Sequence, residues 1–359
     1  MTNAFELDLD HWTLRLAEWG QPAYRARQVF AGMWRRASSF EEMTDISRAL
    51  RARLAEETPQ QLEVLTERQA DRGATRKGLL RLGDRHVVET VLMGYRGRAT
   101  VCVSSQAGCA MGCTFCATGH MGLQNNLSAG EIAAQVVWAA RTARHLPTWT
   151  PQRVTNVVFM GMGEPMANYR STSEAIGRLL DPGGMDLGAR HVTVSTVGVV
   201  PGIRRLASDH PQVGLAVSLH AADDELRTEL VPVNRWWPLA ELEQAVLGWR
   251  EATHRRPSIE WTMMRGVNDD DRQAKLLALI AHRLRAHVNL IPMNPVAGAP
   301  YQPSSPERIQ GFVGVLRGKG IPVTVRDTRG REIDAACGQL RWEFGDGSAP
   351  GASVQIAKG

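Results

Sequence analysis

From residue 99 onward, short apolar segments with the composition of β-strands alternate with longer segments of amphipathic helical periodicity. The expected strands lie near 99–104, 154–160, 191–196, 213–219, 258–264, 286–291 and 321–326. The expected helices lie at about 128–144, 171–180, 201–209, 238–253, 269–285 and 305–318. Strands that alternate with helices and are apolar on both faces form parallel sheets. We therefore expect an α/β fold, a partial (β/α)6 barrel over residues 99–343, with its active site at the carboxyl ends of the strands.

The first 98 residues have a different pattern. Residues 1–70 carry apolar positions at helical spacing, separated by many arginines, which predicts a small, basic helical accessory domain. The strand-like runs Gly78–Leu82 and His86–Met93 flank Gly83-Asp84, a hairpin signal, so residues 71–98 are expected to form a β-hairpin linker. The glycine-rich tail, 344–359, is expected to be flexible.

Charge and cysteine usage narrow the function classes. The net charge of +5 and the pI near 9.2 favour a polyanionic partner, although a compositional bias of the source organism explains them equally well. Five cysteines, three of them in one short segment, are untypical of a disulfide scaffold and fit a reducing compartment. The N-terminus has no apolar signal-peptide core, and no apolar run is long enough to span a bilayer. We expect a cytoplasmic protein.

Three cysteines follow the first expected strand of the barrel in the pattern C-x3-C-x2-C: Cys109, Cys113 and Cys116. Iron–sulfur clusters are normally held by four cysteines, so three thiolates leave one iron of a 4Fe–4S cluster open to a small molecule. The alternatives are a zinc site or buried thiols, but zinc sites usually have four ligands in paired knuckles, and the sequence offers no second pair. The glycines within and beside this motif, Gly108, Gly112 and Gly119, allow the loop to wrap closely around a compact group.

A cluster with an open iron beside a barrel suggests S-adenosylmethionine (SAM), whose amino and carboxylate groups can chelate that iron. Here the chain resembles the radical SAM superfamily. The second expected strand ends in Gly161-Met162-Gly163-Glu164-Pro165, similar to the segment that binds the methionyl amino group, where the alternative is a plain turn with a surface glutamate. Polar groups also follow later strands and form the remaining candidate cofactor site: Ser195, Ser218, Leu219, His220 and Asn294. Each alone is more often a cap or a turn residue, but one rim with one ligand explains them together.

The combined motifs make the resemblance specific. The segments CVSSQAGCAMGCTFCATG, GMGEP, STVGVVPGI, SLHA, NLIPMNP and RGREIDAACGQL, with VET near residue 88, are similar to the RlmN/Cfr family of RNA-modifying radical SAM methyltransferases. This resemblance covers about residues 86 to 340 and implies methylation of C2 of an adenine in 23S rRNA, and of an adenine in tRNA. It also implies a flavodoxin- or ferredoxin-type electron donor, and we expect a monomer.

The family resemblance implies roles for all five cysteines. One SAM methylates Cys337, and a second, bound at the cluster of Cys109, Cys113 and Cys116, yields the adenosyl radical. That radical takes hydrogen from the methyl group, and the resulting methylene radical adds to the adenine ring. Glu89 removes the ring proton, and Cys102 then attacks the sulfur of Cys337, which releases the methylated RNA and leaves a disulfide. From the residues alone, Glu89 reads equally as an outward, solvated strand residue, and Cys102 as a buried small apolar side chain.

Three other functions remain open at this point. A C8-adenine methyltransferase of the Cfr type shares all of these motifs. A radical SAM activase, which makes a glycyl radical on a protein partner, needs the cluster loop but neither Cys102 nor Cys337. A non-enzymatic iron–sulfur module that binds RNA or senses redox state needs no SAM site.

Overall fold

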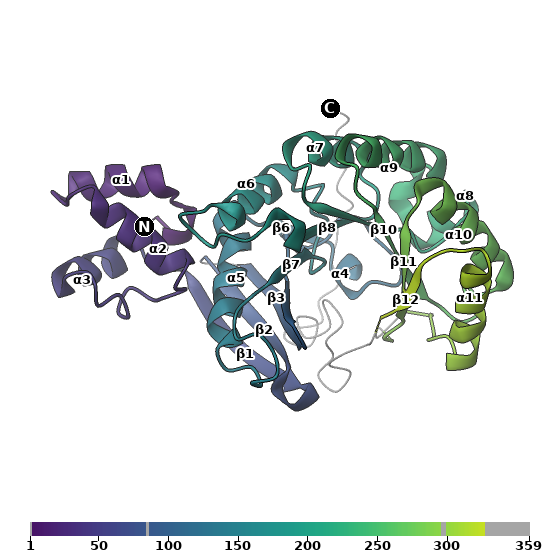
Figure 1. Cartoon of the computed structure of the whole chain (residues 1–359), viewed down its shortest axis with the longest axis horizontal. Helices are drawn as coiled ribbons and strands as arrows, with labels where there is room; N and C mark the ends of the chain where they lie inside the picture. Colours follow the sequence, from purple (N-terminus) through teal and green to yellow (C-terminus); the bar gives the residue numbers. More distant parts are fainter. Residues whose placement is uncertain (1, 84–85, 296–298, 327–359) are drawn as a thin grey trace. The chain divides into compact units, whose positions relative to one another are not determined.

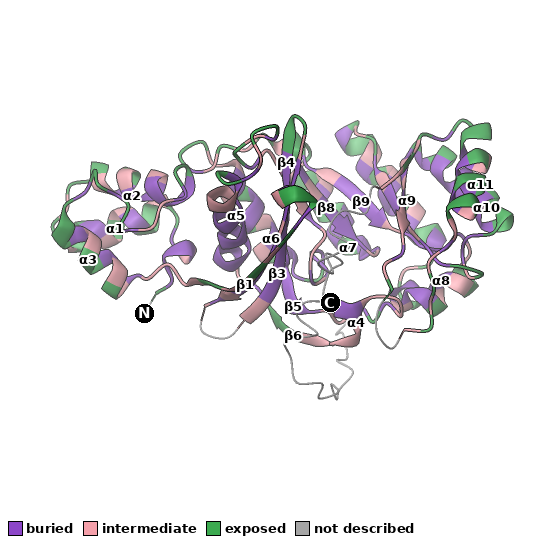
Figure 2. Ribbon diagram, turned by 90° about the horizontal axis from the view of Figure 1, so that it is seen from below, coloured by how far each residue is buried: buried purple, intermediate pink, exposed green. Residues whose placement is uncertain are grey.

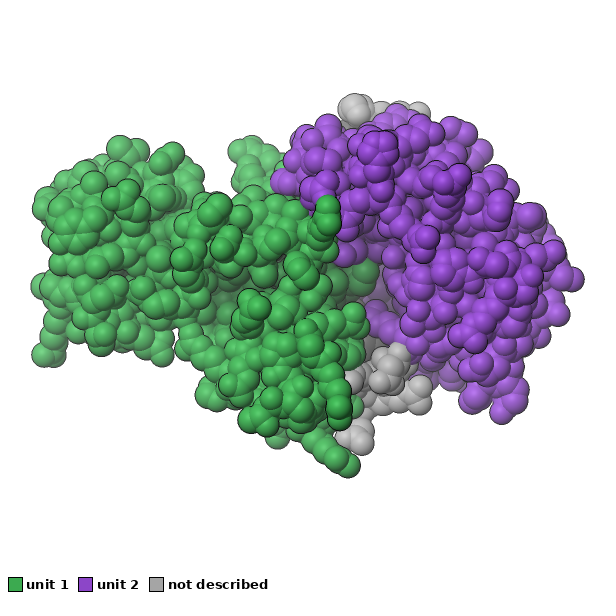
Figure 3. All heavy atoms as spheres, viewed as in Figure 1, with its two compact units in different colours: residues 1–105, 126–161, 170–192 green, residues 106–125, 162–169, 193–359 purple. Residues whose placement is uncertain are grey.

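The computed structural model describes residues 2–83, 86–295 and 299–326. The expectations for Asp84, for Cys337 and for the tail 344–359 therefore lie outside the described residues. The chain divides into two compact units (Figure 3). Unit 1 comprises residues 1–105, 126–161 and 170–192, and unit 2 comprises residues 106–125, 162–169 and 193–359.

Three helices open unit 1, preceded by the 3-10 turn η1 (Ala4–Glu6): α1 (Leu9–Glu18), α2 (Tyr24–Trp34) and α3 (Arg48–Glu57) (Figure 1). Asp8 and Ser47 cap α1 and α3, because each side chain accepts a hydrogen bond from the amide three residues on. The helices enclose a buried aromatic core, with the rings of Phe5 and Trp34 edge to face at 5.6 Å. The helical domain expected at the N-terminus is therefore present as far as Glu57, but it is not basic, because its eight arginines are outnumbered by nine aspartates and glutamates.

The remainder of the expected helical region is a strand. Leu62–Ala70 forms β1, which pairs antiparallel with β2 (Thr75–Leu82). This strand was missed because β1 is an edge strand with exposed charged residues, and its polar pattern reads as a solvated helix. The expected hairpin is confirmed on either side of the turn by β2 and β3 (His86–Tyr95), which pair antiparallel from Thr75 to Leu82.

The sheet of unit 1 has the order β1-β2-β3-β4-β7. β4 (Arg98–Cys102) pairs antiparallel with β3 and parallel with β7 (Asn156–Phe159). The largely buried helix α5 (Ala129–Ala143) covers one face of the sheet (Figure 2), and a capping box between Ser128 and Glu131 forms its N-terminus. A Cβ at Gly78 would lie 2.7 Å from the Trp138 ring, so the glycine lets α5 approach β2 closely. Helix α6 (Tyr169–Leu180) follows β7.

Unit 2 holds parallel strands that alternate with helices, as the sequence pattern predicts. The strands pair in the order β8-β9-β10-β11-β12. They are β8 (Val192–Thr196), β9 (Gly214–Ser218), β10 (Ser258–Met263), β11 (His287–Pro292) and β12 (Val323–Val325). The helices are α7 (Val200–Asp209), α8 (Asp224–Leu230), α9 (Leu239–Thr253), α10 (Asp271–Leu284) and α11 (Pro306–Gly318). In the described part of the chain, every helix is too short or too polar to cross a membrane.

Candidate functional site

The three clustered cysteines lie on a short, closed loop of unit 2. It begins at β5 (Gln106–Gly108), which pairs with β6 (Leu123–Asn126), and it contains the single-turn helix α4 (Ala117–His120). The amide of Cys109 donates to the carbonyl of Gly122 at 2.9 Å, and the amide of Cys116 donates to the carbonyl of Cys113 at 3.1 Å. The Thr114 amide donates to the carbonyl of Leu230 at 3.1 Å, which ties the loop to the end of α8. The bond between Cys109 and Gly122 therefore joins the two ends of the loop, and the bond from Thr114 fixes its middle to α8.

Glycine is required where this loop closes. Gly108 has a φ of +77°, and a Cβ there would lie 1.9 Å from the carbonyl oxygen of Gly122. A Cβ at Gly119 would lie 2.9 Å from the carbonyl oxygen of Cys113. Contacts this short with backbone atoms cannot be relieved by a side-chain rotation. The expected role of these glycines, close wrapping of the loop, is confirmed at these two positions.

Gly108→Ala is expected to open the loop and to destabilise the protein by about 2–4 kcal/mol, from the left-handed φ and the backbone clash together. Gly177→Ala is the matched control. Gly177 lies on an exposed face of α6 with open space around a Cβ, so alanine there should stabilise the helix by about 0.5–1 kcal/mol. Thermal unfolding and bound iron per chain measure both effects. A Gly108→Ala protein with unchanged Tm and iron content would show that the loop does not need this approach.

The thiols of the loop are electrostatically coupled. Burial raises the pKa of Cys109 to about 12, with further increases from Cys116 and Glu164. Burial also raises the pKa of Cys113 and of Cys116, and the neighbouring thiols add to the effect at Cys113. A thiolate is unfavourable in this buried loop unless a positive charge lies beside it. A cationic iron centre provides that charge, prefers soft sulfur donors and deprotonates the thiols that bind it. The donor chemistry thus fits a cluster, although no group of three or more metal-ligating side chains converges among the described residues.

The Gly163-Glu164 segment packs directly on the start of the cysteine loop. Gly163 has a φ of +97°, and a Cβ there would lie 2.5 Å from the Cβ of Gln106. The Gln106 side-chain carbonyl accepts a hydrogen bond from the Glu164 amide at 2.8 Å. One carboxylate oxygen of Glu164 accepts from the Met166 amide at 2.9 Å, and the other accepts from the Val197 amide at 2.8 Å. Glu164 is only 2% exposed, so the alternative of a surface glutamate is wrong.

The electrostatics of Glu164 suit a cationic ligand. Burial raises its pKa to about 7, against the two backbone amides and a Thr196 hydrogen bond that lower it. The two carboxylate oxygens have four lone pairs in all, so these three hydrogen bonds leave room for one more. An ammonium group beside this carboxylate would compensate the charge that burial disfavours.

The carboxyl ends of β8 and β9 bring two of the predicted site residues together. The hydroxyls of Ser195 and Ser218 lie 3.2 Å apart. Two residues further on, His220 has a φ of +62°, and its Nδ1 accepts from the Thr262 amide at 3.0 Å. Its other ring nitrogen therefore carries the proton. Burial, with a contribution from the Arg227 charge, lowers the pKa of His220 to about 3, so the ring is a neutral hydrogen-bond donor.

The sequence interpretation missed two polar residues in the neighbouring strands, the buried Glu260 and the half-buried Asn289. Ser218, Glu260 and Asn289 are register partners across β9, β10 and β11, so they share one face of the sheet. The Asn289 amide donates to Glu260 at 2.8 Å, and burial raises the pKa of that carboxyl. The available signal was a glutamate or an asparagine flanked by apolar residues in each of two strands, SIEWTM and HVNLIP.

Arg227, also missed, is fully buried and organises the two strand ends. Its guanidinium donates to the carbonyls of Val197 at 2.6 Å and Leu219 at 3.2 Å, and to the side chain of Asn234 at 2.6 Å. Burial lowers its pKa to about 10, which leaves it charged at neutral pH. The same cation interacts favourably with the Cys113 thiolate. The Arg227 guanidinium thus binds carbonyl groups in the turn after β8 and in the turn after β9.

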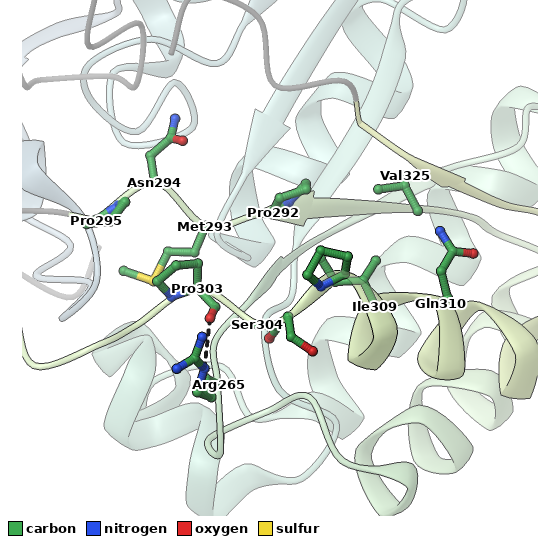
Figure 4. Close-up of a pocket in the computed structure, with 12 residues that line it drawn as sticks. Arg265, Pro292, Met293, Asn294, Pro295, Pro303, Ser304, Ile309, Gln310 and Val325 are labelled. Atoms are coloured by element: carbon green, nitrogen blue, oxygen red, sulfur yellow. Dashed lines mark hydrogen bonds between the residues drawn. The ribbon is translucent and has the colours of Figure 1, made fainter. Parts of the chain in front are cut away.

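Asn294 lines a pocket to which neither Ser195 nor Ser218 contributes. It follows β11, and the pocket has a volume of about 560 Å³ and mostly apolar walls from Met293, Pro303 and Ile309 (Figure 4). The pocket is bordered by Arg265, whose Nε donates to the Pro303 carbonyl at 3.1 Å. Among the described residues predicted to bind the cofactor, only Asn294 lines this pocket.

A second group of predicted residues gathers on the sheet of unit 1. Cys102 pairs with Val91 across β4 and β3, and Glu89 precedes Val91 by two residues, so both side chains point to the same face. Glu89 is 2% exposed, and Lys77 Nζ lies 2.9 Å from its Oε2. The alternative of a solvated strand residue is therefore wrong for Glu89. Cys102 packs with Val91 and Met93 in a buried cluster.

Comparisons with known proteins agree with this arrangement. Two family models match: the radical SAM superfamily over residues 103–278, and the ribosomal RNA large subunit methyltransferase N-terminal domain over residues 2–59. Two relatives described as probable dual-specificity RNA methyltransferase RlmN come from Chloroflexus aurantiacus and Frankia alni. The first is 51% identical over 94% of this chain and 92% of its own length, and the second is 53% identical over 90% and 79%.

A solved structure extends the comparison to the fold. The crystal structure of a radical SAM methyltransferase from Sphaerobacter thermophilus is 49% identical, with a TM-score of 0.89. The match covers 94% of this chain and 99% of that one. The expected fold class is thereby confirmed.

Proposed function

Because the chain belongs to the RlmN family of the radical SAM superfamily, we propose that it methylates C2 of an adenine in 23S rRNA, and an adenine in tRNA, through a methylated cysteine. Radical SAM enzymes use a 4Fe–4S cluster and SAM. The observation that carries the proposal is the shared, buried face of Glu89 and Cys102 in unit 1. An activase has no use for a base and a second thiol at these positions.

The cofactors are assigned to residues of unit 2. Cys109, Cys113 and Cys116 hold the cluster, one per chain. The SAM site consists of Gly163, Glu164, Ser195, Ser218, Leu219, His220 and Asn294. When bound, the cluster would supply the electron for reductive cleavage of SAM. Glu164 orients the ammonium group of SAM, and the paired hydroxyls of Ser195 and Ser218 are suited to bind a ribose or carboxylate.

The remaining steps belong to three side chains of this protein. Cys337, outside the described residues, accepts a methyl group from SAM on its sulfur. Glu89 removes the proton from the adenine ring carbon after the new carbon–carbon bond has formed. Cys102 then attacks the sulfur of Cys337, which breaks the bond between the sulfur and the methylene carbon and leaves a disulfide. The released carbon keeps the electron pair of that bond and takes up a proton to become the methyl group of the RNA. The buried setting of Glu89 and Cys102 shields both groups from water.

The partner is RNA that presents an unpaired or extruded adenine, because an adenine inside a duplex is unreachable. The description of the relatives as dual-specificity RNA methyltransferases supports more than one RNA substrate, and the matching N-terminal family model supports rRNA as one of them. The helices α1–α3, which match the methyltransferase N-terminal domain, carry exposed Arg27, Arg35 and Arg48 suited to phosphate contacts. In this proposal the chain also divides into an accessory domain, a hairpin linker and a barrel. The electron donor is of the flavodoxin or ferredoxin type, and the protein is a cytoplasmic monomer.

SAM binding is expected to strengthen as the pH rises through about 7, the pKa of Glu164. Only the ionised carboxylate pairs with an ammonium, so the apparent Kd weakens by up to about tenfold for each pH unit below that value. His220 stays neutral throughout this range, so it does not contribute to the pH dependence of the Kd for SAM. Equilibrium binding of SAM to cluster-loaded protein between pH 5.5 and 8 measures the effect. Glu164→Gln should bind more weakly with a flat profile, and an unchanged slope in that variant would contradict the assignment.

The products of SAM test the proposed function. Anaerobic, cluster-loaded protein with a strong reductant and RNA should form S-adenosylhomocysteine and 5′-deoxyadenosine in equal amounts. The first product reports methylation of Cys337, and the second reports radical formation. An activase would give 5′-deoxyadenosine alone, and a non-enzymatic iron–sulfur module would give neither product.

A further inference from the structure

We propose that Lys77 is a positioning residue for the proton-removing base. Its ammonium group holds Glu89 ionised and fixed on the sheet face that also carries Cys102. This inference rests on the proposed role of Glu89 as the base.

The pair is buried on both sides. Lys77 Nζ lies 2.9 Å from Glu89 Oε2, and the two side chains are 0% and 2% exposed. Lys77 stands opposite Val91 across β2 and β3, and Glu89 stands opposite Leu79. Residues opposite each other share a face, so Lys77, Glu89 and Cys102 all point away from α5. The other face meets α5 through Thr90, which donates to Gln135 at 2.8 Å.

A lysine at this position is informative in an arginine-rich chain. Only four of the 42 basic residues are lysines, and Lys77 is fully buried. A guanidinium would engage both oxygens of a carboxylate, whereas an ammonium is a compact point charge. The Lys77 ammonium lies 2.9 Å from Oε2 of Glu89. A base needs one oxygen that can receive the proton, and lysine meets that need better than arginine.

Loss of the Lys77 ammonium would have a large energetic effect, because burial penalises an unpaired charge by several kcal/mol. With Lys77 present, the buried carboxylate is compensated and can stay ionised until it takes the ring proton. The pair is then an ammonium beside a neutral acid. Without the ammonium, Glu89 would be expected to bind a proton before the substrate arrives and could no longer act as a base.

The other charged or titratable groups around Glu89 do not replace this cation. Arg68 on β1 is the register partner of Lys77, which places it one strand further from Glu89. Cys102 on β4 carries no positive charge, so it cannot take the place of the Lys77 ammonium. On the opposite face, α5 carries Glu131, which lies 4.0 Å from His86 at the start of β3. The Glu89 main chain is anchored separately, since the Ser104 hydroxyl donates to its carbonyl at 2.7 Å.

The test compares Lys77→Met, Lys77→Arg and the control Lys275→Met, which removes an exposed lysine on α10. Single-turnover methylation is measured against pH with cluster-loaded protein. Lys77→Met should be about 100-fold slower at neutral pH, with a rate that recovers as the pH rises. Lys77→Arg should keep the wild-type pH profile at a reduced rate, and Lys275→Met should match wild type. A wild-type profile in folded Lys77→Met would overturn the inference.

Glu89→Gln separates the two possible failures. If this variant still methylates RNA, the assignment of the base is wrong whatever Lys77 does. If it is inactive while Lys77→Met is unaffected, only the role of Lys77 fails. Stability provides a readout independent of activity. Lys77→Met should lower the Tm, and the double variant Lys77→Met/Glu89→Gln should regain part of the loss, because no uncompensated carboxylate remains. A double variant no more stable than Lys77→Met would also contradict the inference.

Discussion

Cys113→Ala is expected to leave the protein without a stable cluster and to reduce RNA methylation by at least roughly 1,000-fold, since the whole radical step depends on the cluster. Cys113 is the most buried of the three loop cysteines, and its thiolate interacts with the buried Arg227 cation. Alanine removes one of three protein ligands at a position that water cannot easily fill. The remaining two thiols would leave two corners of the cluster without a protein ligand, so the cluster would not be stable.

Iron and sulfide content, the visible absorption of the cluster and 5′-deoxyadenosine formation measure this loss. Cys102→Ala is the matched control, since it removes a buried thiol from unit 1 and should retain iron and SAM cleavage. A Cys113→Ala protein with a full 4Fe–4S complement and normal SAM cleavage would contradict the ligand assignment.

Cys102→Ala is expected to stop the reaction one step later, with RNA covalently attached to the protein. In the proposed sequence only the Cys102 thiolate breaks the bond between the Cys337 sulfur and the methylene carbon. Without this thiolate the adduct has no route to resolution, so turnover should fall by roughly 1,000-fold or more. An RNA-dependent shift on a denaturing gel, with mass spectrometry of the attached nucleotide, detects the adduct.

The double variant Cys102→Ala/Cys337→Ala is the control for this experiment. It should form no adduct, because the methyl-accepting sulfur is missing. Multiple turnovers by Cys102→Ala alone, with free methylated RNA, would contradict the resolving role of Cys102.

The sequence predicts the fold well where periodicity carries the information. The parallel strands of unit 2 and the helices between them, apart from the short α8, which was not expected, lie within a few residues of their expected positions, because buried strands and amphipathic helices differ strongly in pattern. β1 was missed for the converse reason. An exposed edge strand with charged residues has no apolar periodicity to distinguish it from a solvated helix.

The candidate site could be predicted only in part. Polar residues at strand ends can be read from the sequence, and the structure brings Ser195 and Ser218 together as expected. Pairing across strands cannot be read in this way, because it depends on register. The ion pair of Lys77 with Glu89 and the contact of Asn289 with Glu260 both follow from register. The two amides that bind the Glu164 carboxylate come from its own turn and from the turn after β8, so only the folded chain shows them.

The central claim is that this protein methylates C2 of adenine. Its most direct test is mass spectrometry of the nucleosides from 23S rRNA and tRNA after reaction with cluster-loaded protein, SAM and a reductant. The account predicts 2-methyladenosine in both RNAs, formed only when the protein carries Cys337. Formation of 8-methyladenosine would instead identify a C8 methyltransferase of the Cfr type, and the absence of any methyladenosine would contradict the proposed activity altogether.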